Sequence, residues 1–153
     1  MQREVTQMND IREKITELIN NYYDEGFFLG STEEALIKDI EIKLGIILPE
    51  SYKWYVKTYG CGGIGFDIIG VGKDNNLSVV NSTEKYRKFG LAKGLVVIED
   101  VGEWIYCLDT DRIKDNECPV VTWSMHDKDG VIERNDNFYE YLLDNLNEAI
   151  DNL

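Results

Sequence analysis

The sequence predicts a single α+β domain, residues 1–153, in which a mainly antiparallel sheet of about five to six strands is flanked by N-terminal and C-terminal helices. Residues up to about 60 place apolar side chains at helical spacing, and so do residues 138–150. Between them, short β-rich runs alternate with clusters of glycine, asparagine and aspartate, as strands alternate with turns. A chain of 153 residues, 43% of them hydrophobic, can bury a core without disulfides or a structural metal.

Two helices are expected before residue 46. Asn9 or Asp10 can cap the first, which should end before Gly26. Its apolar stripe has a period of 3.6 residues and consists of Ile11, Ile15, Leu18, Ile19 and Tyr22. Residues 31–34, Ser-Thr-Glu-Glu, form a capping box that opens the second helix, and Gly45 can end it in a left-handed conformation.

A third helix and a last one are expected to enclose the strands. Pro49 suits the first position of the third helix, which should end before Gly60. Its inner face consists of Tyr52, Tyr55, Val56 and Tyr59. Residues 135–137 can cap the last helix. The inner face of that helix consists of Phe138, Tyr141, Leu142, Leu146, Ala149 and Ile150.

Five runs are expected to be strands, namely residues 64–69, 77–80, 95–98, 104–108 and 120–123. The fourth run is apolar on both faces, with Trp104 and Tyr106 opposite Ile105 and Cys107, so it should be central. Residues 72–76 and 127–130 read as tight turns, and residues 81–89 as a short helix.

The charge is concentrated in the C-terminal part of the chain. The net charge is −13, and residues 95–153 contain 15 acidic and four basic residues, against 14 and 12 in residues 1–94. Such a surface repels phosphate, which argues against direct nucleic-acid binding. It attracts basic protein partners, although acidic residues kept only for solubility would give the same composition.

The chain is expected to be cytoplasmic and without contact to a membrane. Its apolar runs are far shorter than the roughly 20 residues that span a bilayer, and residues 1–5 show no secretory signal. The chain has three cysteines, Cys61, Cys107 and Cys118. Their odd number and the absence of a Cys-x-x-Cys pair favour reduced, partly buried thiols.

The residues indicate no catalytic, metal or cofactor site. His126 is the only histidine and does not stand in a nucleophile motif. The acidic pairs Asp109/Asp111 and Asp127/Asp129 do not fit the spacing of a calcium-binding EF-hand loop. The glycines of residues 60–65 follow a helix and precede a strand, which is the wrong order for a phosphate-binding loop. We therefore expect that the protein is not an enzyme and uses no cofactor.

Several stretches together resemble the SUKH superfamily, the Smi/Knr-type family named after fungal cell-wall regulators. They are Ser31-Thr32-Glu33-Glu34, Ile40 to Gly45, the Leu-Pro-x-x-Tyr-Lys motif at residues 48–53, the small-residue turn at 59–63, and residues 97–109. The resemblance implies an α+β SUKH-like fold and binding rather than catalysis. Bacterial members are mostly immunity proteins of polymorphic toxin systems, and the chain is most similar to the short members paired with LXG-type toxins, where a toxin can be a ribonuclease.

The expected activity is therefore that of an immunity protein that covers the basic substrate-binding surface of a cognate toxin, and the charge favours a nuclease as that toxin. The contact charges are expected from Glu99, Asp100, Glu103, Asp109, Asp111, Asp127 and Asp129, and the apolar anchors from Trp104 and Trp123. One alternative is a regulatory or scaffolding module similar to the fungal relatives. Another is a small-molecule-binding domain or cryptic enzyme. The sequence does not predict an oligomeric state.

Overall fold

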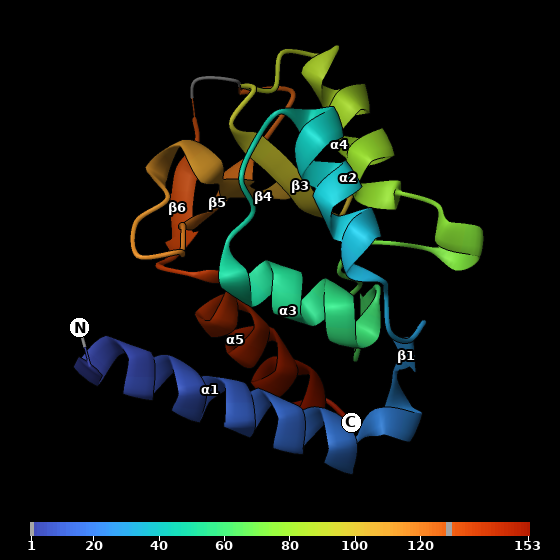
Figure 1. Ribbon diagram of the computed structural model, residues 1–153, viewed down its shortest axis with the longest axis vertical. Helices are drawn as coiled ribbons and strands as arrows, with labels where there is room; N and C mark the ends of the chain where they lie inside the picture. The colour runs from blue at the N-terminus through green and yellow to red at the C-terminus, as the bar shows by residue number, and fades with distance from the viewer. Residues whose placement is uncertain (1, 128–129) are drawn as a thin grey trace.

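The α+β class is confirmed in the computed structural model, which describes residues 2–127 and 130–153 (Figure 1). The described helices are α1 Gln2–Asn21, α2 Glu34–Leu44, α3 Glu50–Tyr59, α4 Ser78–Arg87 and α5 Phe138–Asp151. The strands are β1 Phe27–Phe28, β2 Gly62–Gly63, β3 Leu95–Asp100, β4 Ile105–Asp109, β5 Val120–Trp123 and β6 Ile132–Asn135. Short 3-10 turns occupy Tyr23–Glu25, Lys73–Asn75 and Thr110–Arg112.

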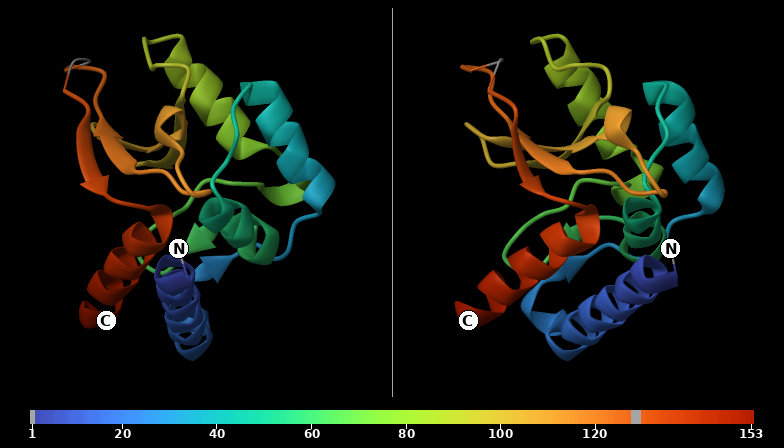
Figure 2. Two further views of the ribbon diagram at one scale, coloured as in Figure 1. Left: turned by 60° about the vertical axis from the view of Figure 1, so that its left-hand side comes forward. Right: turned by 90° about the vertical axis from the view of Figure 1, so that its left-hand side faces the viewer.

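Strands β3 to β6 form an antiparallel sheet in sequence order, and β1 pairs with β2 in a separate small one. Strand β4 is central between β3 and β5, as its two apolar faces predict. Helices α2 and α4 lie side by side to the right of the sheet, and α1 packs along α5 at the bottom of the molecule (Figures 1 and 2).

The sheet buries both faces against different helices. On one face, Tyr86 of α4 packs in a small cluster with Val97, Cys107 and Trp123 of the strands. On the other, strand residues such as Ile98 and Leu108 join the main core, which α3 and α5 complete. The protein therefore has a helix–sheet–helix core of the kind an α+β domain needs.

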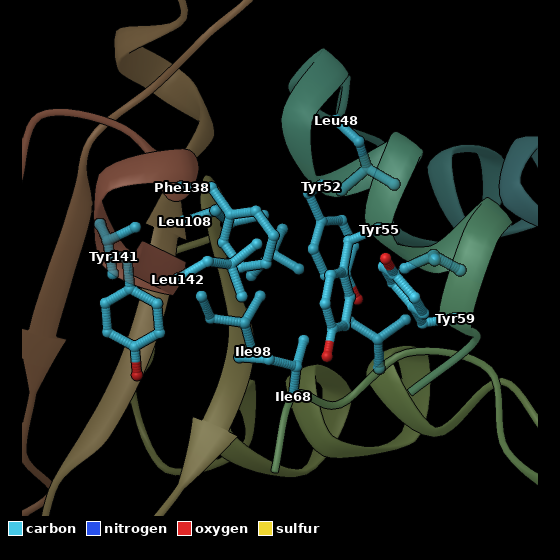
Figure 3. Packing of buried hydrophobic residues seen from close by; sticks show 14 of the residues in the cluster. Leu48, Tyr52, Tyr55, Tyr59, Ile68, Ile98, Leu108, Phe138, Tyr141 and Leu142 are labelled. Atoms are coloured by element: carbon cyan, nitrogen blue, oxygen red, sulfur yellow. The ribbon is translucent and has the colours of Figure 1, made fainter. Parts of the chain in front are cut away.

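Aromatic side chains fill the space between α3 and α5. Figure 3 shows Tyr52 and Tyr55 of α3 facing Phe138 of α5, with Ile98 and Ile68 below them. The buried tyrosine hydroxyls keep their hydrogen bonds, because Tyr52 donates to the Ile69 carbonyl and Tyr55 to the Gly62 carbonyl, each at 2.6 Å. The predicted inner face of the third helix is thus confirmed.

Some predicted boundaries are wrong. Helix α1 begins at Gln2 rather than after Asn9 or Asp10, and α2 has Glu33 rather than Ser31 at its N-cap. The caps at Gly45 (φ 69°) and Asn137 are confirmed, and the Asn137 side chain accepts a hydrogen bond from the Glu140 N–H at 3.0 Å.

Two of the five predicted strands do not form, and β6 was not predicted. Residues 64–69 fold back on β2, with a bridge between Gly62 and Ile68. This path requires glycine at position 62, because its φ is 107° and it approaches the Phe27 carbonyl too closely for any side chain. Residues 78–80 open α4, where Val79 and Val80 are buried on the helix face despite their β-branched side chains. The turn predicted at 127–130 has its centre outside the described residues.

The N-terminus of α3 is capped by a residue far away in the sequence. The Ser51 N–H donates to Glu117 Oε2 at 3.0 Å, and the Ser51 hydroxyl donates to the other oxygen. Burial raises the pKa of Glu117 to about 6, even though both hydrogen bonds favour its charged form. This carboxylate is therefore a structural element of the fold.

Candidate binding surface at one end of the sheet

The strand register separates the predicted contact residues into two groups. Asp100 pairs with Ile105, which pairs with Trp123, so the β3–β4 turn and the segment after β5 lie at the same end of the sheet. Asp109 pairs with Leu95 at the opposite end. The predicted residues therefore do not form one face.

At the first end, exposed apolar and acidic side chains lie together. We call this region the turn surface; it consists of Asp100, Val101, Glu103, Trp104, Met125 and Asp127, all exposed. Trp104 leaves 42% of its surface exposed and Val101 54%. A large exposed aromatic residue beside carboxylates is typical of a protein-binding surface rather than of a solvated loop.

Hydrogen bonds hold this turn in shape. Asp100 accepts one from the Tyr86 hydroxyl at 2.6 Å and one from the Gly102 N–H at 2.9 Å. The Val101 N–H donates to the Trp104 carbonyl at 3.1 Å. The backbone that carries Trp104 is thus organised before any partner arrives, which lowers the entropy lost on binding.

Two predicted contact residues are buried instead, which corrects their expected role. Trp123 is 1% exposed and packs edge-on against Tyr86, with ring centroids 5.9 Å apart. Glu99 is 7% exposed because a bulge between Val97 and Glu99 breaks the strand alternation and turns it inward. The Tyr141 hydroxyl donates to its carboxylate, while burial raises the pKa of Glu99.

The acids at the other end of the sheet are engaged with their own chain. Arg112 lies 3.8 Å from the Asp109 carboxylate and 3.2 Å from that of Glu133. The Asp111 carboxylate lies directly against Gly94, where a Cβ would be 2.3 Å from its Oδ2. These contacts support a local structural role for Asp109 and Asp111. The remaining predicted acid, Asp129, lies outside the described residues.

A groove beside the turn surface escaped the sequence analysis. It consists of two hollows of about 730 and 510 Å³ that share Gly65, Phe66, Glu99 and Val101 in their walls. Phe27 and Asp67 line the first hollow, and Arg134 lines the second. These residues come from distant parts of the chain, and no local pattern marks them as neighbours.

The groove contains a guanidinium stacked on aromatic rings. The Arg134 guanidinium carbon lies 4.9 Å from the centroid of Tyr106 and 5.2 Å from that of Tyr141. Its charge favours the ionised form of the neighbouring Glu99. Arg134 thus compensates one side of a carboxylate that is otherwise surrounded by protein.

The remaining candidate chemistry is confined to single side chains. All three cysteines are free, and burial raises the pKa of each thiol, which disfavours the reactive thiolate. Across residues 2–127 and 130–153, no three His, Cys, Asp or Glu side chains are arranged to hold a metal ion. In the same ranges, no helix combines the length and apolarity needed to cross a bilayer.

Residues 8–147 match a protein family, SUKH_5, which is described as SMI1-KNR4 cell-wall. This match covers most of the chain. The protein belongs to the SUKH family.

The stretches that carry the SUKH resemblance take defined places in the structure. The Leu-Pro motif at residues 48–53 leads into α3, and residues 59–63 form the turn into β2. Residues 97–109 are the end of β3, the turn and β4, and so include Asp100 to Trp104 of the turn surface. The SUKH scaffold of this chain therefore presents the exposed part of its longest hairpin at one end of the sheet.

Proposed function

We propose that this SUKH protein is an immunity protein, which binds a cognate toxin through the turn surface and so neutralises it. Immunity proteins are among the members of the family. The observation that carries the proposal is the exposed Trp104, which stands in a hydrogen-bonded turn with the acidic Asp100 and Glu103, at the end of the sheet where Asp127 follows β5. Aromatic anchors surrounded by polar residues dominate the binding energy of many protein interfaces.

The charge of the surface indicates a basic partner. A nuclease must be basic where it grips phosphates, so an acidic inhibitor can occupy that groove and exclude the substrate. We therefore propose a nuclease toxin, in particular a ribonuclease of an LXG-type system. The acidic side chains would also speed the encounter, and this effect would weaken with salt.

Co-expression with the product of the adjacent open reading frame tests the proposal. The wild-type protein should restore growth and co-purify with the toxin. The double variant Glu103→Lys/Asp127→Lys should lose protection, with an association rate at least about tenfold lower, because two attractive charges become repulsive. Both side chains are exposed, so the variant should fold normally.

A matched control keeps the change in total charge but moves it elsewhere. Glu13→Lys/Asp39→Lys alters two exposed acids on α1 and α2, away from the sheet. It should protect as well as the wild type. Equal loss of protection by both double variants would show that only total charge matters, and full protection by Glu103→Lys/Asp127→Lys would exclude the turn surface. A non-toxic neighbour would favour the alternative of a regulatory or scaffolding module.

A further inference from the structure

The two outer strands of the main sheet differ in how their edges are covered. Strand β3 is closed by its own chain, because the Val97 N–H donates to the Thr83 hydroxyl at 3.0 Å. The Ile98 carbonyl likewise accepts from the Ile69 N–H at 2.8 Å. Bonds within the chain therefore occupy groups with which another strand could pair.

Strand β6 is the outer strand on the opposite side, and its edge is open (Figure 2). In the part of the chain that the structure describes, no backbone–backbone hydrogen bond outside the ladder with β5 involves residues 131–134. Val131 is 44% exposed and Ile132 61%. Exposed β-branched side chains beside unpaired backbone groups form a template for an added strand.

The register shows which backbone groups of β6 face outward. The Asp109 N–H donates to the Pro119 carbonyl at 3.0 Å. Two residues along the ladder, Cys107 and Val121 are the next bonded pair, because bonded and non-bonded pairs alternate. Val121 therefore directs its N–H and C=O toward β4, and Glu133, which lies opposite Val121, directs its own away from β5. The backbone groups of Glu133 thus belong to the open edge.

The charged side chains of β6 are held by their own chain. The Glu133 carboxylate lies 3.2 Å from the Arg112 guanidinium. The Arg134 guanidinium lies over the rings of Tyr106 and Tyr141. Charges on an edge strand commonly oppose pairing with another strand, but these two are already engaged with neighbours on the sheet and on α5.

The open edge begins beside the turn surface. Ile132 pairs with Thr122, and Trp123 pairs with Ile105, so the start of β6 lies at the same end of the sheet as Trp104. A strand added to β6 would therefore continue the turn surface. The net charge of −13 disfavours a second copy of this chain as the occupant and favours a basic protein.

We propose that β6 binds an extended segment of the basic protein partner, which adds a fifth strand to the sheet. The backbone N–H and C=O of Glu133 pair with that segment, and its side chains pack on Val131 and Ile132. The identity of the partner rests on the proposed function, whereas the open edge does not. The toxin would then be held through side chains at the turn surface and through its backbone at β6.

A titration of the ¹⁵N-labelled protein with the peptide acetyl-Lys-Val-Lys-Val-Lys-amide, followed by NMR, tests the edge without any toxin. We expect saturable shifts centred on the amides of Ile132, Glu133 and Arg134, with a dissociation constant on the order of 1 mM. The same peptide with its backbone nitrogens methylated keeps its charge but has no N–H to donate. It should bind at least about tenfold more weakly.

Paired variants separate the backbone of β6 from its side chains. Glu133→Pro removes the outward N–H together with the carboxylate, whereas Glu133→Ala removes the carboxylate alone. Glu133→Pro should bind the peptide and the toxin at least about tenfold more weakly than Glu133→Ala. The two should have similar melting temperatures, because proline is tolerated on the open side of an edge strand. Ile132→Pro interrupts the ladder with β5 and should melt at a lower temperature.

Hydrogen exchange measures the added strand in the complex with the toxin. The Glu133 amide should exchange rapidly in the free protein and at least about tenfold more slowly in the complex. Equal binding of the methylated peptide, or peptide shifts that lie away from β6, would overturn the inference.

The outcome is separate from that of the proposed function. Peptide binding at β6 in a protein that protects against no toxin would overturn the function alone. A toxin that leaves the Glu133 amide unprotected, and that binds Glu133→Pro as well as Glu133→Ala, would overturn the added strand alone.

Discussion

The strands of the β3–β4 hairpin and the turn that joins them belong to one continuous segment, yet their surroundings differ completely. Ile98, Ile105 and Leu108 are buried in the two clusters on either side of the sheet, while Val101 and Trp104 remain exposed. The hydrogen bonds of the turn fix its shape without covering it. Stability and binding should therefore depend on different residues of the same hairpin, and mutations can test that separation.

The largest effect is expected in the aromatic core. Tyr55→Ala removes a fully buried ring between α3 and α5 and should lower the free energy of unfolding by about 3–5 kcal/mol, because a cavity remains. Urea denaturation measures this change. The control Tyr55→Phe keeps the ring and removes one of two donors to the Gly62 carbonyl, which still accepts from the Ile68 N–H, so it should lose about 1 kcal/mol. A Tyr55→Ala variant as stable as Tyr55→Phe would contradict the packing.

A smaller effect, with a characteristic pH dependence, is expected at Glu117. Its pKa of about 6 in the folded protein exceeds the ordinary value of 4.5, so the folded state binds the proton more tightly than the unfolded state. The contribution of Glu117 to stability should thus be fully present below about pH 4.5 and fall by about 2 kcal/mol as the pH rises through 6. The raised pKa of Glu99 acts in the same direction.

The variant Glu117→Gln isolates this contribution. Its amide oxygen can still accept from Ser51, but it has no proton to lose, so its loss of stability between pH 4.5 and 6.5 should be smaller than that of the wild type by about 2 kcal/mol. Urea denaturation at several pH values measures the difference. Identical pH profiles of the two proteins, or a wild type that gains stability over this interval, would refute the assignment.

Glu117 also illustrates which contacts cannot be predicted from the sequence. Residues 120–123 and the tyrosine face of α3 could be predicted because alternation and helical spacing are local properties. Glu117 caps a helix that lies 66 residues away in the chain, and such a contact leaves no local pattern. The same reason explains Glu99, whose burial follows from a bulge and from Tyr141, 42 residues further on.

The candidate site also has features that the sequence predicts and features that only the structure shows. The acidic character of the C-terminal region could be inferred from composition, since it does not depend on neighbours in space. Composition could not show that Asp109 lies at the far end of the sheet from Asp100, because pairing register decides this. Helix propensity in turn failed at residues 78–80, where burial of Val79 and Val80 outweighs their preference for strands.

The smallest effect on stability, and the largest on binding, is expected at Trp104. Because Trp104 is 42% exposed and belongs to neither buried cluster, Trp104→Ala should change the free energy of unfolding by only about 1 kcal/mol. Under the proposed function it should weaken toxin binding by at least about 2 kcal/mol, roughly 30-fold, as loss of an aromatic anchor does. Denaturation and titration calorimetry measure the two quantities on the same sample.

The matched control is Ile47→Ala, since Ile47 is 67% exposed but follows α2, outside the turn surface. Removal of this apolar side chain should affect neither stability nor toxin binding. If Trp104→Ala destabilised the protein as strongly as a core variant, the hairpin turn would be part of the folding core and the contrast with its strands would fail. If Ile47→Ala weakened binding as much as Trp104→Ala, the contact surface would lie on the helices instead of the hairpin.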